Sequence, residues 1–331
     1  MRPSKSLQIP DSATSPFVVQ GGAPLAPGKF SNPTLTARGE ARAKVSLRDL
    51  ETLWFNTGTL CNLTCLNCYI ESSPRNDALS YLSVEDVEGF LDEIDALRLP
   101  TREIGFTGGE PFMNPDILAM LEVTLARGHQ ALVLTNAMRP MMRWADRLIA
   151  LQRRHGHRLT VRVSLDHHTE VVHDAERGDG AWAKALEGLT WLSREGFQIA
   201  VAARSLPAES EQVARANYAR LFASLRLGID AEDPAELVLF PEMDAIGDVP
   251  EITEACWGLL GKSPDEVMCS SSRMVVKRRG ASGPAVVACT LIPYDRAFEL
   301  GGMLSDALGA VSLNHPHCAR FCVLGGGRCS A

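Results

Sequence analysis

Between residues 51 and 241, short apolar segments alternate with longer segments whose apolar residues recur at helical spacing. The short segments predict six strands, at 51–57, 102–107, 130–136, 159–166, 198–205 and 235–241. The longer segments predict helices at about 83–97, 114–127, 139–155 and 180–195, with another that ends near 226. Apolar strands that alternate with helices form a parallel sheet covered by helices, so the sequence predicts an α/β fold.

Residues at the ends of these helices support the prediction. Ser83 is followed three positions later by Asp86, a pattern typical of a capping box at a helix start. Asn114 and Pro115 are suited to begin the second helix, and Gly128 to end it.

The two flanks of this region have a different character. Residues 1–48 are rich in Pro, Gly, Ser and Thr and lack a sustained period, so we expect an extended N-terminal arm. Residues 273–279 and 284–290 are apolar segments joined by a Gly/Ser turn, which predicts a β-hairpin. We therefore expect an arm over 1–48, an α/β domain over 49–250 and a small α+β domain over 251–331.

Charge and hydropathy exclude some classes of partner. The chain of 331 residues has a formal net charge of −7, which argues against nucleic acid as the main partner. It contains no window of 18 apolar residues, and its first residues lack the apolar core of a secretory signal. We expect a cytoplasmic protein that does not bind a membrane.

The nine cysteines are clustered rather than spread along the chain. Cys61, Cys65 and Cys68 lie within eight residues, and none follows until Cys256. An odd number with this clustering indicates metal ligation in a reducing compartment rather than a disulfide framework. Three incidental thiols are the alternative.

The first three cysteines directly follow the first predicted strand. In parallel α/β folds, ligands bind at the carboxyl ends of the strands. A structural zinc ion normally has four protein ligands, whereas three thiolates leave one metal position open. The spacing therefore favours an iron–sulfur cluster with one iron available to a small molecule.

The segment CNLTCLNCY, residues 61–69, resembles the cluster loop of radical S-adenosylmethionine (SAM) enzymes, Cys-x3-Cys-x2-Cys followed by an aromatic residue. The resemblance implies that Cys61, Cys65 and Cys68 hold a [4Fe-4S] cluster whose fourth iron takes the amino and carboxylate groups of SAM. It also places Tyr69 beside the adenine.

Further segments are similar to the same family. FTGGEPFMNPD, residues 106–116, resembles its Gly-Gly-Glu-Pro motif, in which Gly108 and Gly109 let the backbone approach a ligand closely. The resemblance implies that Gly109 and Glu110 hold the SAM amino group, that Ser164 and Asp166 face the ribose hydroxyls, and that Arg177 meets the SAM carboxylate. We also expect Thr135, Asn136 and Arg204 at the carboxyl edge of the sheet, where they would line the same site. For Arg204, the alternative is an exposed charge at the rim.

The C-terminal region resembles the twitch domain, a shortened SPASM domain that follows the barrel in one branch of this family. The resemblance implies a partial (β/α)6 TIM-like barrel with a small α+β domain that holds one auxiliary [4Fe-4S] cluster. Its expected ligands are Cys269, Cys289, Cys318 and Cys322, with Cys329 as the rival for the last position. Zinc on the same thiolates is the alternative.

The resemblance implies reductive cleavage of SAM to a 5′-deoxyadenosyl radical that abstracts a hydrogen atom from the substrate. An electron donor of the flavodoxin or ferredoxin type would supply the electron, and the auxiliary cluster would aid oxidation or position the substrate. No individual catalytic residue is assigned.

Residues 1–48 are too short and irregular for a leader-binding winged helix, so we expect a small-molecule substrate, with maturation of a ribosomal peptide as the alternative. An electron-transfer or sensor protein and a zinc-stabilised scaffold are alternatives of another class. The Gly-Gly-Glu-Pro segment favours an enzyme, because a cluster carrier needs no cosubstrate pocket.

Overall fold

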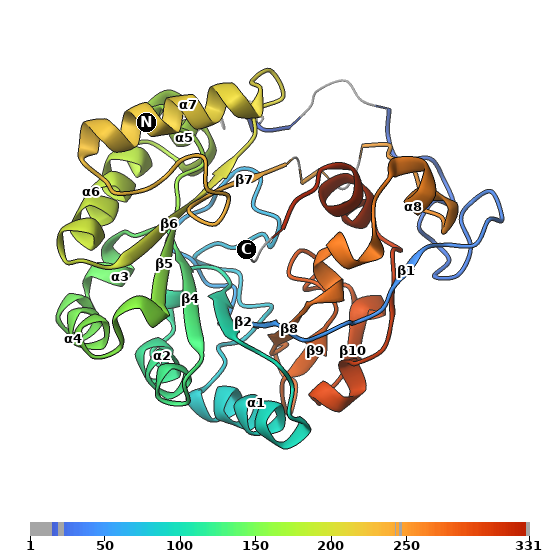
Figure 1. The fold of residues 1–331 in the computed structure, drawn as a ribbon, viewed down its shortest axis with the longest axis horizontal. Coiled ribbons are helices and arrows are strands. Elements are labelled where there is room, and N and C mark those ends of the chain that lie inside the picture. Colours follow the sequence, from blue (N-terminus) through green and yellow to red (C-terminus); the bar gives the residue numbers. More distant parts are fainter. Residues whose placement is uncertain (1–14, 19–22, 242, 245–246, 329–331) are drawn as a thin grey trace, which may run out of the picture.

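The computed structural model describes residues 15–18, 23–241, 243–244 and 247–328. In this part of the chain, most strands belong to one sheet with the order β10-β9-β8-β2-β3-β4-β5-β6-β7. Figure 1 shows the sheet curving around the molecule with the helices on its outer side. Its six central strands are β2 Thr52–Asn56, β3 Glu103–Thr107, β4 Gln130–Thr135, β5 Leu159–Ser164, β6 Gln198–Arg204 and β7 Leu237–Phe240.

These strands correspond to the six predicted from hydropathy, and each pairs in parallel with the next. Their side chains are mostly buried, as in β2, where all five are. Burial on both faces explains why the strands appear in the sequence as continuous apolar segments rather than alternating ones. The predicted partial (β/α)6 barrel is confirmed.

Helices connect the strands. Their bounds are α1 Val84–Leu97, α2 Ile117–Ala126, α3 Arg139–Met142, α4 Ala145–His155, α5 Glu170–Arg177, α6 Ala181–Arg194, α7 Glu211–Leu225 and α8 Ala255–Leu260. The capping box of α1 forms as predicted: the Asp86 amide donates to Ser83 Oγ over 3.3 Å, and the Ser83 amide donates to an Asp86 carboxylate oxygen over 2.9 Å. None of these helices, within the described ranges, is long and apolar enough to cross a membrane.

Two helices differ from the prediction. The segment expected as one helix over 139–155 is divided into α3 and α4 at Trp144, whose indole N–H donates to the carbonyl of Phe112 over 3.2 Å. Helix α5 was not predicted, because its buried residues are His173 and Glu176 rather than an apolar stripe. Polar residues that are buried in a functional site leave no hydropathy signal.

The predicted hairpin also forms, with β8 (Ser272–Val276) antiparallel to β9 (Ala285–Val287). In addition, β8 pairs in parallel with β2, with Ser272 opposite Thr52. The C-terminal hairpin therefore continues the sheet of the barrel, and β10 (Glu299–Gly301) extends it further. A short π-helix, Cys318–Leu324, follows near the C-terminus.

Residues 23–48 of the N-terminal arm run along the C-terminal region (Figure 1), whereas Ser15 and Phe17 contact the barrel at Glu176 and Arg204. Strand β1 (Lys44–Val45) pairs with β11 (Val311–Ser312). The buried Arg42 guanidinium donates to the carbonyls of Asn32, Leu35 and Leu313 and pairs with Glu251. The side chains of Phe30, Ala43 and Val45 join a hydrophobic core with the C-terminal region, distinct from the larger core between sheet and helices.

Candidate active site

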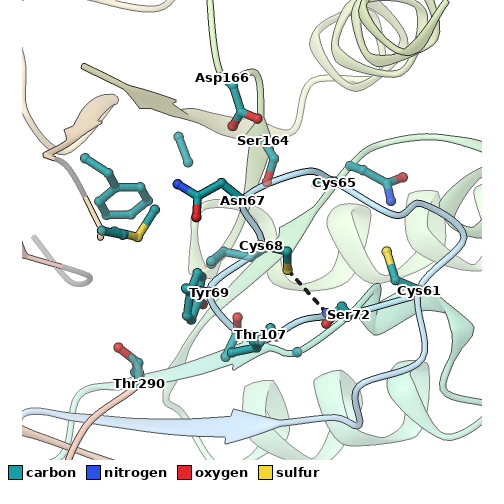
Figure 2. Close-up of a pocket in the computed structure, with 18 of the residues that line it drawn as sticks. Cys61, Cys65, Asn67, Cys68, Tyr69, Ser72, Thr107, Ser164, Asp166 and Thr290 are labelled. Carbon is teal, nitrogen blue, oxygen red and sulfur yellow. Dashed lines mark hydrogen bonds between the residues drawn. The ribbon is translucent and has the colours of Figure 1, made fainter. Parts of the chain in front are cut away.

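One cavity lies at the carboxyl ends of the parallel strands, next to the loop that follows β2. Figure 2 shows Cys61, Cys68 and Tyr69 on this loop, with Ser164 and Asp166 on a neighbouring segment. The cavity brings together most of the residues predicted from the sequence: Cys61, Cys65, Cys68, Tyr69, Gly108, Gly109, Thr135, Asn136, Ser164, Asp166, Arg177 and Arg204. These residues come from segments more than 140 positions apart in the chain.

The cysteine loop directs backbone N–H groups at its own sulfur atoms. The Leu63 amide donates to Cys61 Sγ and the Ser72 amide to Cys68 Sγ, each over 3.4 Å (Figure 2 for the second). Burial raises the pKa of Cys61 to about 12 and that of Cys65 to about 11. The two thiols therefore keep their protons at neutral pH unless a metal centre displaces them. The donor set, three sulfur atoms that face a cavity with N–H groups aimed at them, fits a cluster with one open position.

Gly108 and Gly109 bring the turn after β3 against this loop. Gly108 has a φ of +134°, which disfavours any residue with a side chain. A Cβ atom at Gly109 would lie 2.2 Å from the carbonyl oxygen of Leu60. The Gly109 amide also donates to the carbonyl of Gly58 over 2.8 Å. The two glycines thus fix the loop that carries Cys61, in addition to lining the cavity.

Glu110, in contrast to the sequence-based expectation, does not line the cavity. Its buried carboxylate accepts hydrogen bonds from the Thr135 hydroxyl and the Asn136 amide, each over 2.8 Å, and from the Phe112 amide over 3.2 Å. Burial raises the pKa of Glu110 to about 7, although these hydrogen bonds favour the ionised form. In this structure the side chain holds the end of β4 in place, and the expected contact with the SAM amino group stays a prediction.

Asp166 and Arg177 form a bidentate ion pair on the cavity wall. The Nε and Nη2 atoms of Arg177 donate to the two Asp166 oxygens over 2.6 and 2.9 Å. Burial by itself would raise the pKa of Asp166, but the Arg177 charge and hydrogen bonds hold that pKa below its ordinary value. The wall therefore offers a carboxylate and a guanidinium side by side, each in its charged form.

Glu176 is a central residue that the sequence analysis missed. Its carboxylate accepts from the Asn67 amide over 2.8 Å and from the Ser15 hydroxyl over 2.5 Å, and lies 3.2 Å from Nη1 of Arg204. The Arg204 guanidinium also lies 4.4 Å from the ring centre of Phe17. Arg204 is only 6% exposed, so the alternative of a rim charge is wrong. Glu176 links the cysteine loop, the strand end and the N-terminal segment.

The wall opposite these polar residues is largely apolar and was also not predicted. It is formed in part by the C-terminal region, through Thr290, Leu291 and Phe321, and in part by Phe240 at the end of β7 and Met243 just after it. Figure 2 shows Thr290 on the far side of Tyr69 from Asp166. Contacts between segments this distant give no local signal in the sequence.

Four of the remaining cysteines converge on a second, smaller cavity. Cys269, Cys289, Cys318 and Cys322 line it together with His317 and with apolar side chains, among them Leu313. Leu291 lines both cavities. The described cysteines are all free of disulfide bonds. Cys329, the rival for the last ligand position, lies outside the described residues.

The spacing of the sulfur atoms bears on the choice between zinc and a cluster. Ligands of one tetrahedral zinc ion at about 2.3 Å lie about 3.8 Å apart. Within the described ranges, no three cysteine sulfur atoms lie within 4.8 Å of one another, so neither set is gathered as closely as the ligands of one zinc ion.

Comparison with known proteins agrees with this geometry. The sequence model of the radical SAM superfamily matches residues 55–208. The antilisterial bacteriocin subtilosin biosynthesis protein AlbA of Bacillus subtilis (strain 168) is 34% identical over 143 residues, 43% of this chain and 30% of AlbA. The mycofactocin maturase MftC of Mycobacterium ulcerans (strain Agy99) is 32% identical over 137 residues, 41% of this chain and 35% of MftC. The chain thus matches about a third of the length of these relatives.

Solved structures show the same fold. Streptococcus suis SuiB bound to its precursor peptide SuiA has a TM-score of 0.57 at 12% identity, covering 80% of this chain and 64% of SuiB. SuiB bound to S-adenosylmethionine has a TM-score of 0.55 at 12% identity, covering 79% and 65%. The region matched by the family model contains the cysteine loop, both glycines and the strand ends that line the cavity. Residues 55–208 therefore form a domain of the radical SAM superfamily, whose enzymes use a [4Fe-4S] cluster and SAM.

Proposed function

We propose that this protein is a radical SAM enzyme whose cluster is held by Cys61, Cys65 and Cys68 and whose SAM occupies the adjoining cavity. The observation that carries the proposal is the convergence of these three cysteines with Gly109, the Asp166–Arg177 pair and the other predicted residues on that cavity. When bound, the reduced cluster and SAM supply a 5′-deoxyadenosyl radical that abstracts a hydrogen atom from the substrate.

The protein's own residues orient the cosubstrate. Asp166, kept ionised by Arg177, is suited to accept hydrogen bonds from ribose hydroxyls, with Ser164 next to it. Arg177 supplies positive charge for the SAM carboxylate, and Tyr69 supplies an aromatic face for the adenine. Glu110 lies behind the cavity wall, where its hydrogen bonds fix the positions of Thr135 and Asn136 in that wall.

We further assign the second cysteine set to an auxiliary [4Fe-4S] cluster in a twitch-like region over 251–331, after a barrel over 49–250 and an arm over 1–48. The shared cavity of Cys269, Cys289, Cys318 and Cys322 supports this assignment. Zinc on the same thiolates is the competing occupant, and metal analysis distinguishes it from an iron–sulfur cluster.

For the substrate, we propose a peptide. The sequence favoured a small molecule on the character of residues 1–48, but AlbA and MftC are named for peptide-product biosynthesis and maturation, and SuiB is solved with a precursor peptide. The apolar wall of Phe240, Met243, Leu291 and Phe321 is suited to hold an apolar side chain against the cosubstrate. The electron donor is a low-potential protein of the flavodoxin or ferredoxin type, and the free thiols suit a reducing compartment such as the cytoplasm.

The test is anaerobic reconstitution, followed by counting iron and sulfide and assaying dithionite-driven formation of 5′-deoxyadenosine from SAM. We expect about eight irons per chain together with 5′-deoxyadenosine, which corresponds to two [4Fe-4S] clusters. About four irons with activity would remove the auxiliary cluster from the proposal. Protein that binds neither iron nor SAM would contradict the enzyme assignment.

A further inference from the structure

We propose that His167, His168 and Glu209 form a binding site for one divalent transition metal ion, zinc in the first place, separate from both cysteine sets. The two histidines lie in the loop between β5 and α5, and Glu209 lies between β6 and α7. The site is independent of the proposed radical chemistry.

The three side chains have the spacing of metal ligands. One potential ligand atom from each lies within 4.8 Å of the other two, which distinguishes this group within the described part of the chain. His167 Nε2 lies 3.5 Å from a carboxylate oxygen of Glu209. Ligand atoms about 2.05 Å from a tetrahedral zinc ion lie about 3.3 Å apart, so this pair needs almost no movement to share one ion.

Two imidazole nitrogens in this group are buried without a hydrogen bond. His167 is 4% exposed, and its Nε2 is buried and unpaired by hydrogen bonds, as is Nδ1 of His168. The two rings are adjacent, with their centres 3.9 Å apart. Buried polar atoms are nearly always hydrogen bonded, and a bound ion is one explanation for an unpaired one. An ion shared with Glu209 would bind Nε2 of His167 and one ring nitrogen of His168.

Neighbouring side chains orient these ligands, as is usual around bound metals. Asn217 donates to Oε1 of Glu209 over 3.0 Å, which leaves Oε2 facing His167. Arg220 in turn donates to the carbonyl oxygen of the Asn217 side chain and so directs the Asn217 NH2 group at Glu209. Nδ1 of His167 lies 2.8 Å from the Thr169 hydroxyl and 3.1 Å from the Thr169 amide nitrogen, which donates to it, and these contacts fix the imidazole ring.

The ligand types select the ion. Two imidazoles and one carboxylate suit zinc and related transition metals rather than calcium or magnesium, which prefer oxygen ligands alone. His168 and Glu209 are partly exposed, so a fourth position is open to water. An ion here would join the loop that carries Asp166 to the segment that follows Arg204, and both of these residues line the SAM cavity.

The test uses cluster-loaded protein, in the wild type and in the variants His168→Ala, Glu209→Gln and His157→Ala. His157 is an exposed histidine far from Glu209 in the sequence and serves as the matched control. Each protein is dialysed against micromolar ZnCl2, and bound zinc is counted. We expect about one zinc more per chain in the wild type and in His157→Ala than in the other two, whose affinity falls at least about tenfold.

X-ray absorption at the zinc edge separates this site from zinc on cysteine. We expect nitrogen and oxygen neighbours at about 2.0 Å, with imidazole scattering and without sulfur at about 2.3 Å. Equal zinc in all four proteins, or a shell made of sulfur, would overturn the proposal. Should a variant fail to fold, the absorption spectrum of wild-type protein with zinc still decides, because sulfur-only zinc or no bound zinc contradicts the site.

Discussion

The two cysteine sets differ in what surrounds them. Cys61, Cys65 and Cys68 face a large cavity with a polar wall that includes the Asp166–Arg177 pair. The second set faces a smaller cavity lined mainly by apolar side chains, and the buried Arg273 near it donates to carbonyl oxygens, including that of Cys269 over 2.6 Å. The first environment is suited to exchange small molecules at a metal centre, and the second to enclose one. The contrast agrees with the proposal that the first set holds the reactive cluster and the second an auxiliary one.

The largest effect is expected from the first set. Replacing Cys61, Cys65 and Cys68 together with alanine should remove about four irons per chain and bring 5′-deoxyadenosine formation below detection, because no protein ligand remains for the reactive cluster. Iron analysis and the SAM cleavage assay measure both. Cys256→Ala is the control and should keep all iron and activity, since Cys256 lines neither cavity. SAM cleavage that persists in the triple variant would refute the ligand assignment.

The matching change in the second set should separate iron content from SAM cleavage. Cys318→Ala is expected to lower the iron content by up to about four per chain, while dithionite-driven 5′-deoxyadenosine formation continues. Cys318 is also part of the C-terminal hydrophobic core, so the thermal midpoint should fall. An unchanged iron content would show that the second cavity holds no cluster. Complete loss of SAM cleavage would contradict the proposal that only the first cysteine set is needed for this reaction.

The ion pair on the wall of the first cavity gives the next effect. Arg177→Met leaves the Asp166 carboxylate buried without its partner, which typically costs about 3–5 kcal/mol in free energy of unfolding. Arg279→Met is the matched control, because its pair with Asp77 is exposed and should contribute less than about 1 kcal/mol. Urea unfolding of both variants tests the difference. Equal losses would show that the cavity does not desolvate the pair.

A smaller and pH-dependent effect is expected at Glu110, below the same cavity. Its pKa is raised from 4.5 to about 7, so between these values the folded protein keeps a proton that the unfolded chain releases. The stabilisation from this group is thus complete below pH 4.5 and is lost as the pH rises through 7. Relative to Glu110→Gln, the free energy of unfolding of iron-free wild-type protein should fall by about 2–3 kcal/mol from pH 5 to pH 8. A constant difference between the two proteins would contradict the raised pKa.

The sequence predicted the barrel well because its strands are buried on both faces and its helices carry clear end signals such as the Ser83 capping box. It also predicted most of the first cavity, because strand ends meet at one edge and the cysteine loop is distinctive. It missed α5 and Glu176, whose burial depends on charged partners rather than on an apolar pattern. It predicted that Glu110 contacts the SAM amino group. In the structure the Glu110 carboxylate accepts hydrogen bonds from Thr135 and Asn136, which the sequence did not predict.

The part of the first cavity that the C-terminal region forms could not be predicted from the sequence, for a different reason. The pairing of β8 with β2 joins residues more than 200 positions apart, so it leaves no local signal in the sequence. The apolar wall of Phe240, Leu291 and Phe321 arises only after this pairing brings the hairpin to the barrel.

Leu291 lies between the two cavities, since it belongs to the lining of both. A change of this one residue would therefore alter both sites at once. If both cysteine sets hold clusters as proposed, Leu291 is the residue through which a change in packing at one cluster would reach the other.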